Sequence, residues 1–207
     1  MLELLTGAGL AAAAGMNAYV PLLVVGLAAR LLPDVLQLPE GWAWLSSWWV
    51  IGIIAVLLVV EVVADKVPAV DSVNDVLQTL VRPAAGGLVF GSSTTASTVA
   101  VSDPAEFFAS NQWVPIVLGA VIALVVHAGK TALRPAANVA TGGAAAPVVS
   151  TIEDAGAVGL SVLALVAPIL VLVVLVLLGL FAWSLVRTAR RRRNADLRSA
   201  TERAAEG

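Results

Sequence analysis

Long apolar runs alternate with short polar segments along almost the whole chain. The strongest runs extend from Trp49 to Ala64, from Trp113 to Ala128 and from Gly156 to Val186. Such runs predict transmembrane helices, because the bilayer core accepts apolar side chains and makes charged ones costly. Pro168 predicts a bend in the last of these helices.

The first apolar run, from Leu4 to Ala29, is interrupted near its middle by Gly15, Asn17 and Pro21. Proline removes a helical hydrogen bond, and glycine loosens the backbone. These residues therefore predict a break at Asn17 and Pro21 inside the membrane. The run is either a broken helix or a re-entrant pair of half-helices.

Three further segments are weaker. Pro68 to Arg82 has apolar and polar positions at helical spacing, which predicts an amphipathic helix of about four turns. Residues 83–101 and 132–150 are rich in small residues and could cross a membrane only by packing closely against other helices. Within the latter, Thr141-Gly142-Gly143 predicts a helix break or a close helix contact.

A weak internal repeat is visible when the chain is shifted by 64 residues. The shift aligns Trp49 with Trp113, Ala64 with Ala128, Lys66 with Lys130, Asn74 with Asn138 and Pro83 with Pro147. Each copy contains an interfacial tryptophan, an apolar span, a lysine, a polar segment and a proline. Repeats of this kind underlie many transporter folds.

The composition supports a membrane protein. Hydrophobic residues form 59% of the 207 residues, and the mean hydropathy is +0.95. The chain has no cysteine and one histidine, which excludes thiolate chemistry and a histidine-rich metal centre. We predict no metal, no cofactor and no nucleic-acid partner. No nucleophile and base occur at a recognised catalytic spacing, so an enzyme is the least favoured class.

The two ends of the chain differ in charge from the apolar runs between them. Glu3 lies where a signal peptide would carry basic residues, so we predict no cleavable leader. Residues 1–187 are predicted to form one transmembrane domain, and residues 188–207 a disordered basic tail. The run Arg190 to Arg193 predicts a cytoplasmic C-terminus. If every strong run crosses once, Lys66, Arg82, Lys130 and Arg134 cannot all lie inside. One weak segment must therefore cross or re-enter unexpectedly, and the candidates are the broken first run and residues 132–150.

Ionisable residues follow two of the apolar runs. Such groups at membrane depth are costly, and they are usually paired and functional. They would bind a small ion, a proton or a lipid phosphate. The predicted substrate- or ion-binding residues are Asn17, Glu61, Asp65, Lys66, Asp71, Asp75, Arg82, Lys130, Glu153 and Asp154.

One stripe of the amphipathic segment carries Asp71, Asp75, Gln78 and Arg82. The stripe either faces water on a helix that lies flat at the interface, or faces a polar cavity between helices. Arg82 cannot reach Asp71 within its own helix. If the stripe faces inward, Arg82 must pair with another segment, with Asp65, Glu153 or Asp154 as the expected partners.

The remaining polar residues have simpler explanations beside the functional ones. His127 is either a packed polar residue or a proton relay. Lys130 and Arg134 form a basic pair that could balance the acids, bind lipid phosphate or mark the cytoplasmic interface. Glu153 and Asp154 precede the last apolar run, where carboxylates favour a helix N-terminus.

The most specific motifs of the chain are Gly15-x-Asn17-x-Tyr19-x-Pro21, Glu61-x-x-Ala64-Asp65-Lys66-x-Pro68-x-x-Asp71-x-x-x-Asp75, Arg82-Pro83-x-x-Gly86, Lys130, Thr141-Gly142-Gly143, Pro147-Val148-Val149-Ser150 and Glu153-Asp154. Together they resemble a family of small bacterial membrane proteins, the domain of unknown function family 4126. The resemblance covers nearly the whole chain except the arginine tail. It implies a helical inner-membrane protein and no established activity. Arg134, Pro135 and Ala146 depart from the family's pattern.

The sequence therefore predicts an all-α, multi-pass helical bundle of the bacterial inner membrane. We expect five or six membrane segments, at least one of them broken or re-entrant. The leading function is a small transporter or lipid-handling protein with a charged intramembrane site. The alternative is a non-catalytic scaffold whose charges lock helices together. A transporter requires water to reach the charges, whereas a scaffold requires every charge to be paired in a dry core.

Overall fold

The computed structural model describes residues 1–66, 68–94, 108–109, 111–141 and 145–177, together with 179–180, 183 and 187. Side chains are not described for residues 68–73, 75, 133–141 and 145–146. The chain divides into a first compact unit, Met1–Val171, and a second, Leu172–Gly207. The predicted tail, residues 188–207, lies outside the described residues.

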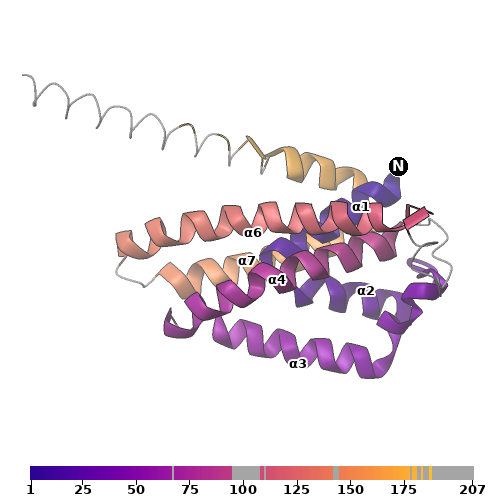
Figure 1. The fold of residues 1–207 in the computed structure, drawn as a ribbon, viewed down its shortest axis with the longest axis horizontal. Coiled ribbons are helices and arrows are strands. Elements are labelled where there is room, and N and C mark those ends of the chain that lie inside the picture. The colour runs from indigo at the N-terminus through magenta and orange to yellow at the C-terminus, as the bar shows by residue number, and fades with distance from the viewer. Residues whose placement is uncertain are drawn as a thin grey trace, which may run out of the picture. The chain divides into compact units, whose positions relative to one another are not determined.

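The regular elements of the described residues are helical, which confirms the all-α prediction (Figure 1). They are α1 (Leu2–Met16), α2 (Tyr19–Leu31), the 3-10 helix η1 (Glu40–Ser46), α3 (Trp48–Ala64), α4 (Pro68–Ser93), α6 (Trp113–Thr141) and α7 (Ala145–Val166). A further short apolar helix spans Pro168–Leu177. Its separation from α7 agrees with the bend predicted at Pro168.

The break predicted in the first apolar run is confirmed. Asn17 has an extended backbone, with φ −144° and ψ 122°, between the end of α1 and the start of α2. Its side-chain oxygen accepts hydrogen bonds from the backbone N–H groups of Tyr19 and Val20, at 3.0 and 3.1 Å. Asn17 thus caps α2, since asparagine satisfies the free amides of a helix N-terminus well. Pro21 follows in the first turn of α2.

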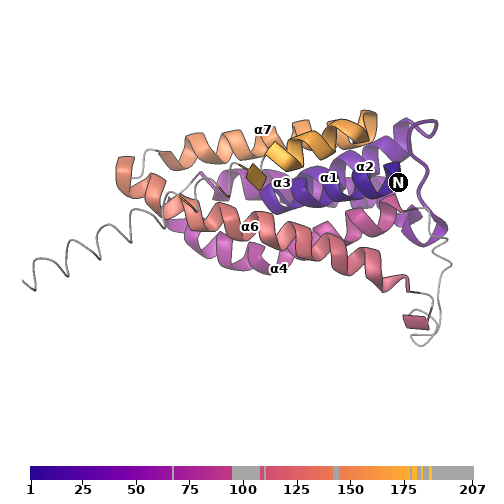
Figure 2. The same ribbon diagram turned by 90° about the horizontal axis from the view of Figure 1, so that it is seen from above.

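Helix α2 returns toward the end of the unit from which α1 enters (Figures 1 and 2). Near the start of α1, the Thr6 hydroxyl donates to the Ala164 carbonyl of α7 at 3.0 Å. At the far end of α2, Leu31 lines an apolar pocket together with Leu165 of α7. The two half-helices therefore form a helical hairpin with Asn17 at its tip. This is the geometry that the re-entrant alternative predicts.

The boundary predicted between Arg82 and Pro83 is wrong, because α4 continues through Pro83 to Ser93. Proline lacks one donor, but packed neighbouring helices make such a loss tolerable in a membrane bundle. Close packing is provided by small residues on α4 and α6. A Cβ atom added to Gly86 would lie 2.5 Å from the Ala123 Cβ and 2.7 Å from the Gly119 carbonyl oxygen.

The boundaries of the last two helices also differ from the prediction. Helix α6 continues past Ala128 to Thr141, and α7 begins at Ala145. The weak segment predicted from Ala132 to Ser150 is therefore the end of one helix and the start of the next. Gly142 and Gly143 lie outside the described residues. Glu153 and Asp154 lie within α7, so their predicted position at a helix N-terminus is wrong.

Fewer helices can cross a membrane than predicted. Among the described residues, two are long and apolar enough, Trp113–Ala132 and Pro147–Val166. A third crossing is added if η1 and α3, which meet at 59°, form one bent span. The prediction of five or six exceeds this number because the first apolar run is divided into two half-helices, and because the weak segments from Pro83 and from Ala132 belong to other helices rather than forming separate crossings. By length alone, α1 and α2 fall short of a full crossing.

Candidate functional site

Polar side chains from five helices converge at the tip of the α1–α2 hairpin. They come from the ends of α1 and α3 and from the interiors of α4, α6 and α7. The structure links eight predicted site residues by hydrogen bonds and ion pairs, namely Asn17, Glu61, Asp65, Lys66, Arg82, Lys130, Glu153 and Asp154. The side chains of Asp71 and Asp75 lie outside the described residues.

Arg82 on α4 is the centre of this charge network and has 0% of its surface exposed. Its Nη2 donates to Glu61 Oε1 at 2.9 Å and lies 3.8 Å from Asp65 Oδ2. Arg82 thus pairs with carboxylates on another helix, as an inward-facing stripe requires. Asp65 was among the expected partners, whereas the nearer Glu61 was not.

Lys130 on α6 extends the network toward α7. Its Nζ lies 2.7 Å from Glu153 Oε2 and 3.7 Å from Asp65 Oδ2. Lys66, at the end of α3, lies 3.9 Å from Asp154 Oδ2. Glu153 and Asp154 therefore act as partners for lysines rather than as companions of a helix dipole.

Arg82 and Lys130 also bind backbone carbonyls at the tip of the α1–α2 hairpin. Arg82 Nη1 donates to the Gly15 carbonyl at 3.2 Å, and Lys130 Nζ donates to the Met16 carbonyl at 3.3 Å. The last carbonyls of a helix have no partner within the helix and carry partial negative charge. Asn17 Nδ2 also donates to Asp154 Oδ1 at 2.9 Å. The network therefore satisfies a helix end that would otherwise be costly to bury.

His127 on α6 contacts Nη1 of the Arg82 guanidinium, whereas Glu61 contacts Nη2. Its Nδ1 is 3.2 Å from Arg82 Nη1, and its Nε2 is 3.1 Å from Thr79 Oγ1. An arginine nitrogen can only donate, so Nδ1 accepts and the proton of a neutral ring resides on Nε2. His127 therefore orients Arg82 from a neutral ring that donates to Thr79.

Sequence reasoning missed two hydrogen-bonding residues. Asn74 Nδ2 donates to Asp65 Oδ1 at 2.7 Å, and Thr79 contacts His127. Asn74 shares the polar face of the amphipathic segment with Arg82, which was a usable signal. Thr79 lies among apolar residues, and only the packing of α4 against α6 reveals its role.

Burial decreases along the network. The side-chain exposure is 0% for Arg82, 5% for Lys130, 15% for Glu153 and 40% for Lys66. The ion pairs thus form one connected group from Arg82 to Glu153, and Lys66–Asp154 is a separate pair with greater exposure. Among these described residues four carboxylates face three fixed cations, which leaves one excess negative charge when all are ionised.

Some polar atoms at the site have no hydrogen-bond partner among the described residues. These buried atoms are Glu61 Oε2, Gln78 Oε1, Arg82 Nε and Ser150 Oγ. A buried polar atom without a partner is costly and calls for a specific explanation. The described residues contain no group of three or more His, Asp or Glu side chains arranged to hold a metal ion.

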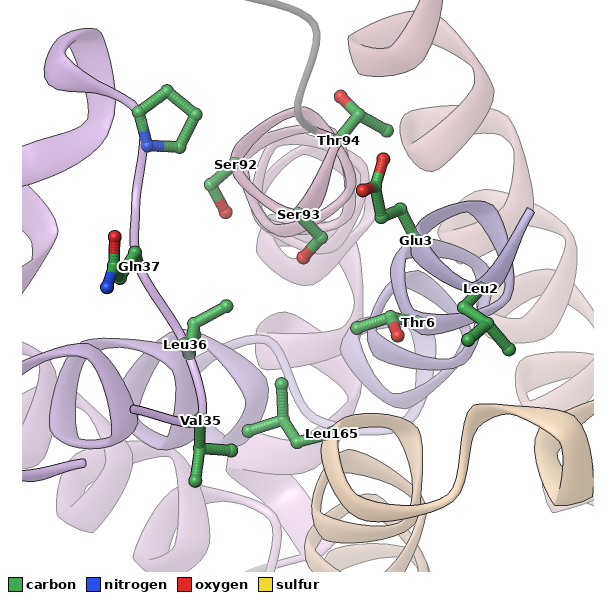
Figure 3. Close-up of a pocket in the computed structure, with 11 residues that line it drawn as sticks. Leu2, Glu3, Thr6, Val35, Leu36, Gln37, Ser92, Ser93, Thr94 and Leu165 are labelled. Atoms are coloured by element: carbon green, nitrogen blue, oxygen red, sulfur yellow. The ribbon is translucent and has the colours of Figure 1, made fainter. Parts of the chain in front are cut away.

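A separate pocket of about 310 Å³ lies at the opposite end of the first unit (Figure 3). The Ser92 and Ser93 oxygens, and the side chains of Leu36 and Leu165, point into it (Figure 3). Both serine hydroxyls donate to the Val89 carbonyl. None of the predicted site residues lines this pocket.

The long apolar helices around a charged centre define the class, a helical membrane protein with a polar interior. The chain belongs to the family described as Domain of unknown function (DUF4126), whose model matches residues 4–188. This confirms the resemblance drawn from the sequence motifs. No curated protein and no solved structure matches the chain.

Proposed function

We propose that the protein is a small ion-coupled transporter of the bacterial inner membrane, with the charge network as its coupling site. The observation that carries the proposal is the series of ion pairs from the buried Arg82 through Asp65 and Lys130 to Glu153, with the separate and more exposed Lys66–Asp154 pair at the next residue of α7. Such a series offers successive positions for a proton or cation between the interior and the surface. The excess carboxylate supports a positively charged coupling ion.

Stability alone is a weak reason for this arrangement. Removing charges from water costs several kcal/mol per ion, and replacing a buried pair with apolar residues is often neutral or stabilising (roughly 1–4 kcal/mol). A helical bundle could therefore be held together without Glu61, Asp65 and Arg82. Ionisable groups inside membrane proteins more often mark pathways for ions or protons.

The α1–α2 hairpin also supports transport. Many transporters place their sites where discontinuous helices end at membrane depth, because the freed backbone groups bind ions. Here the C-terminal carbonyls of α1 at Gly15 and Met16 already bind side-chain cations. Movement of Arg82 or Lys130 would release these oxygens. A lipid phosphate is a less suitable ligand, since both cations are already held by carboxylates.

A scaffold is the second candidate, and one observation favours it. Each charge of the network described above, Lys66 included, has an oppositely charged partner within 4.0 Å. A protein that only locks helices together would have this pairing in a dry core. Water access to the network therefore distinguishes the two candidates.

Ser150 and Ser161 on α7 provide the test, since the chain has no cysteine of its own. Both serines are fully buried. Ser150 lies one turn before Glu153 and Asp154 on α7. Ser161 lies in the other half of α7, where its hydroxyl donates to the Ala157 carbonyl at 2.7 Å. We expect Ser150→Cys to react with a small hydrophilic methanethiosulfonate reagent in lipid vesicles. Ser161→Cys should resist it. Equal resistance at both positions would indicate a dry network and favour the scaffold.

We further propose that the C-terminal tail is cytoplasmic, because a run of four arginines follows the apolar region. In intact cells Ser199→Cys should resist an impermeant thiol reagent. The same variant should react once the membrane is permeabilised, which is the matched positive control. Rapid labelling of Ser199→Cys in intact cells would reverse this topology.

A further inference from the structure

We propose that Glu61, Gln78 and Arg82 bind a single buried water molecule at the innermost end of the charge network. Each of these side chains is at most 3% exposed and carries one buried atom without a partner among the described residues. The atoms are Glu61 Oε2, Gln78 Oε1 and Arg82 Nε. None of them belongs to the ion pairs described above.

The three side chains share one location. Glu61 Oε1 is 2.9 Å from Arg82 Nη2, so the two free atoms lie on neighbouring parts of the same ion pair. Gln78 precedes Arg82 by one helical turn and is buried on the same side of α4. Tyr19 connects them, because its phenol hydrogen-bonds with the Gln78 side chain and interacts with the charges of Glu61 and Arg82.

The unpaired atoms define the chemistry of the ligand. Glu61 Oε2 and Gln78 Oε1 are acceptors, whereas Arg82 Nε carries a hydrogen and can only donate. A water molecule complements this set, since it donates two hydrogen bonds and accepts the third. A metal cation does not complement it, because the Arg82 guanidinium would face the cation with like charge. Buried waters typically make about three hydrogen bonds to otherwise unsatisfied groups.

This water would extend the proposed coupling site, and its role in coupling rests on that proposal. It would allow Glu61 to bind or release a proton at Oε2 while Oε1 remains bonded to Arg82. Among the described residues, Asp65 Oδ2 lies 3.8 Å from Arg82 Nη2, and Lys130 Nζ lies 3.7 Å from the same Asp65 oxygen. In a scaffold the same water would only satisfy buried atoms.

Gln78→Met tests the site by the sign of a change in melting temperature. If the water is present, the variant loses the bonds to both Tyr19 and the water, and we expect a decrease of about 2–6 °C. If the site is dry, the variant removes an unsatisfied acceptor. This gain would offset the lost Tyr19 bond. An unchanged or raised melting temperature would overturn the proposal.

A high-resolution structure of the unmodified protein in lipid gives a second measurement that does not depend on a variant folding. We expect density within hydrogen-bonding distance of Glu61 Oε2, Gln78 Oε1 and Arg82 Nε. Empty space there, or direct contact among the three atoms, would refute the water site. The Ser150→Cys experiment tests the transporter proposal separately from the water site. If Ser150→Cys reacts but no water is found at Gln78, the water site is refuted and the transporter proposal remains.

Discussion

Arg82→Ala should strongly destabilise the protein in detergent. The substitution leaves Glu61 buried without its cation and removes one of two cations near Asp65. It also removes the donor to the Gly15 carbonyl at the hairpin tip. Removing one partner of a buried pair costs roughly 3–5 kcal/mol, because the other charge is stranded. For a chain of this size the melting temperature should fall by about 10 °C or more.

A second substitution identifies the cause of this loss. Glu61→Gln in the Arg82→Ala background should restore part of the stability, since it neutralises the stranded carboxylate. Arg30→Ala is the matched control, because Arg30 is exposed on α2 and lies over the Trp48 ring in a cation–π geometry at 5.5 Å. It should cost about 1 kcal/mol or less. A near-silent Arg82→Ala would show that the network does not hold these helices.

Gly119→Ala should produce the second large effect, at the crossing of α4 and α6. The new Cβ atom would overlap the Gly86 carbonyl oxygen and the Phe90 Cβ atom of the facing helix. Neither atom can move without moving α4, so the helices must separate. Overpacking of this kind costs roughly 1–3 kcal/mol and occasionally more. The separation should also weaken the Arg82–His127 contact of 3.2 Å between the same helices.

The sign of the change in melting temperature separates the effect of helix packing from that of helix propensity. On helix propensity alone, glycine to alanine stabilises a helix by about 1 kcal/mol. Gly129→Ala is the control on α6, because a Cβ atom at Gly129 meets nothing within 4 Å. We expect it to leave the melting temperature unchanged or slightly raised, whereas Gly119→Ala should lower it. Equal effects of both substitutions would contradict the close packing of α4 against α6.

The charged residues of the network were recognisable in the sequence, whereas the fold that assembles them was not. The charges were identified because ionisable residues among apolar runs are unusual wherever the chain places them. The nearest partner of Arg82 was not identified, because Glu61 belongs to a strong apolar run and gives no local sign of facing Arg82. The expected boundary at Pro83 failed for a related reason. Whether a proline ends a helix depends on the neighbouring helices that pack around it.

The sequence by itself determined the features that depend on neighbouring residues. It indicated the all-helical class, the apolar helix ending at Ala64, and the break at Asn17, where an asparagine cap and Pro21 act within one turn. The tertiary structure alone decided that α2 turns back and that α7 begins well before Glu153. It also brought Asn17 to Asp154, which is 137 residues away. Such contacts depend on helix packing, which no local pattern of residues records.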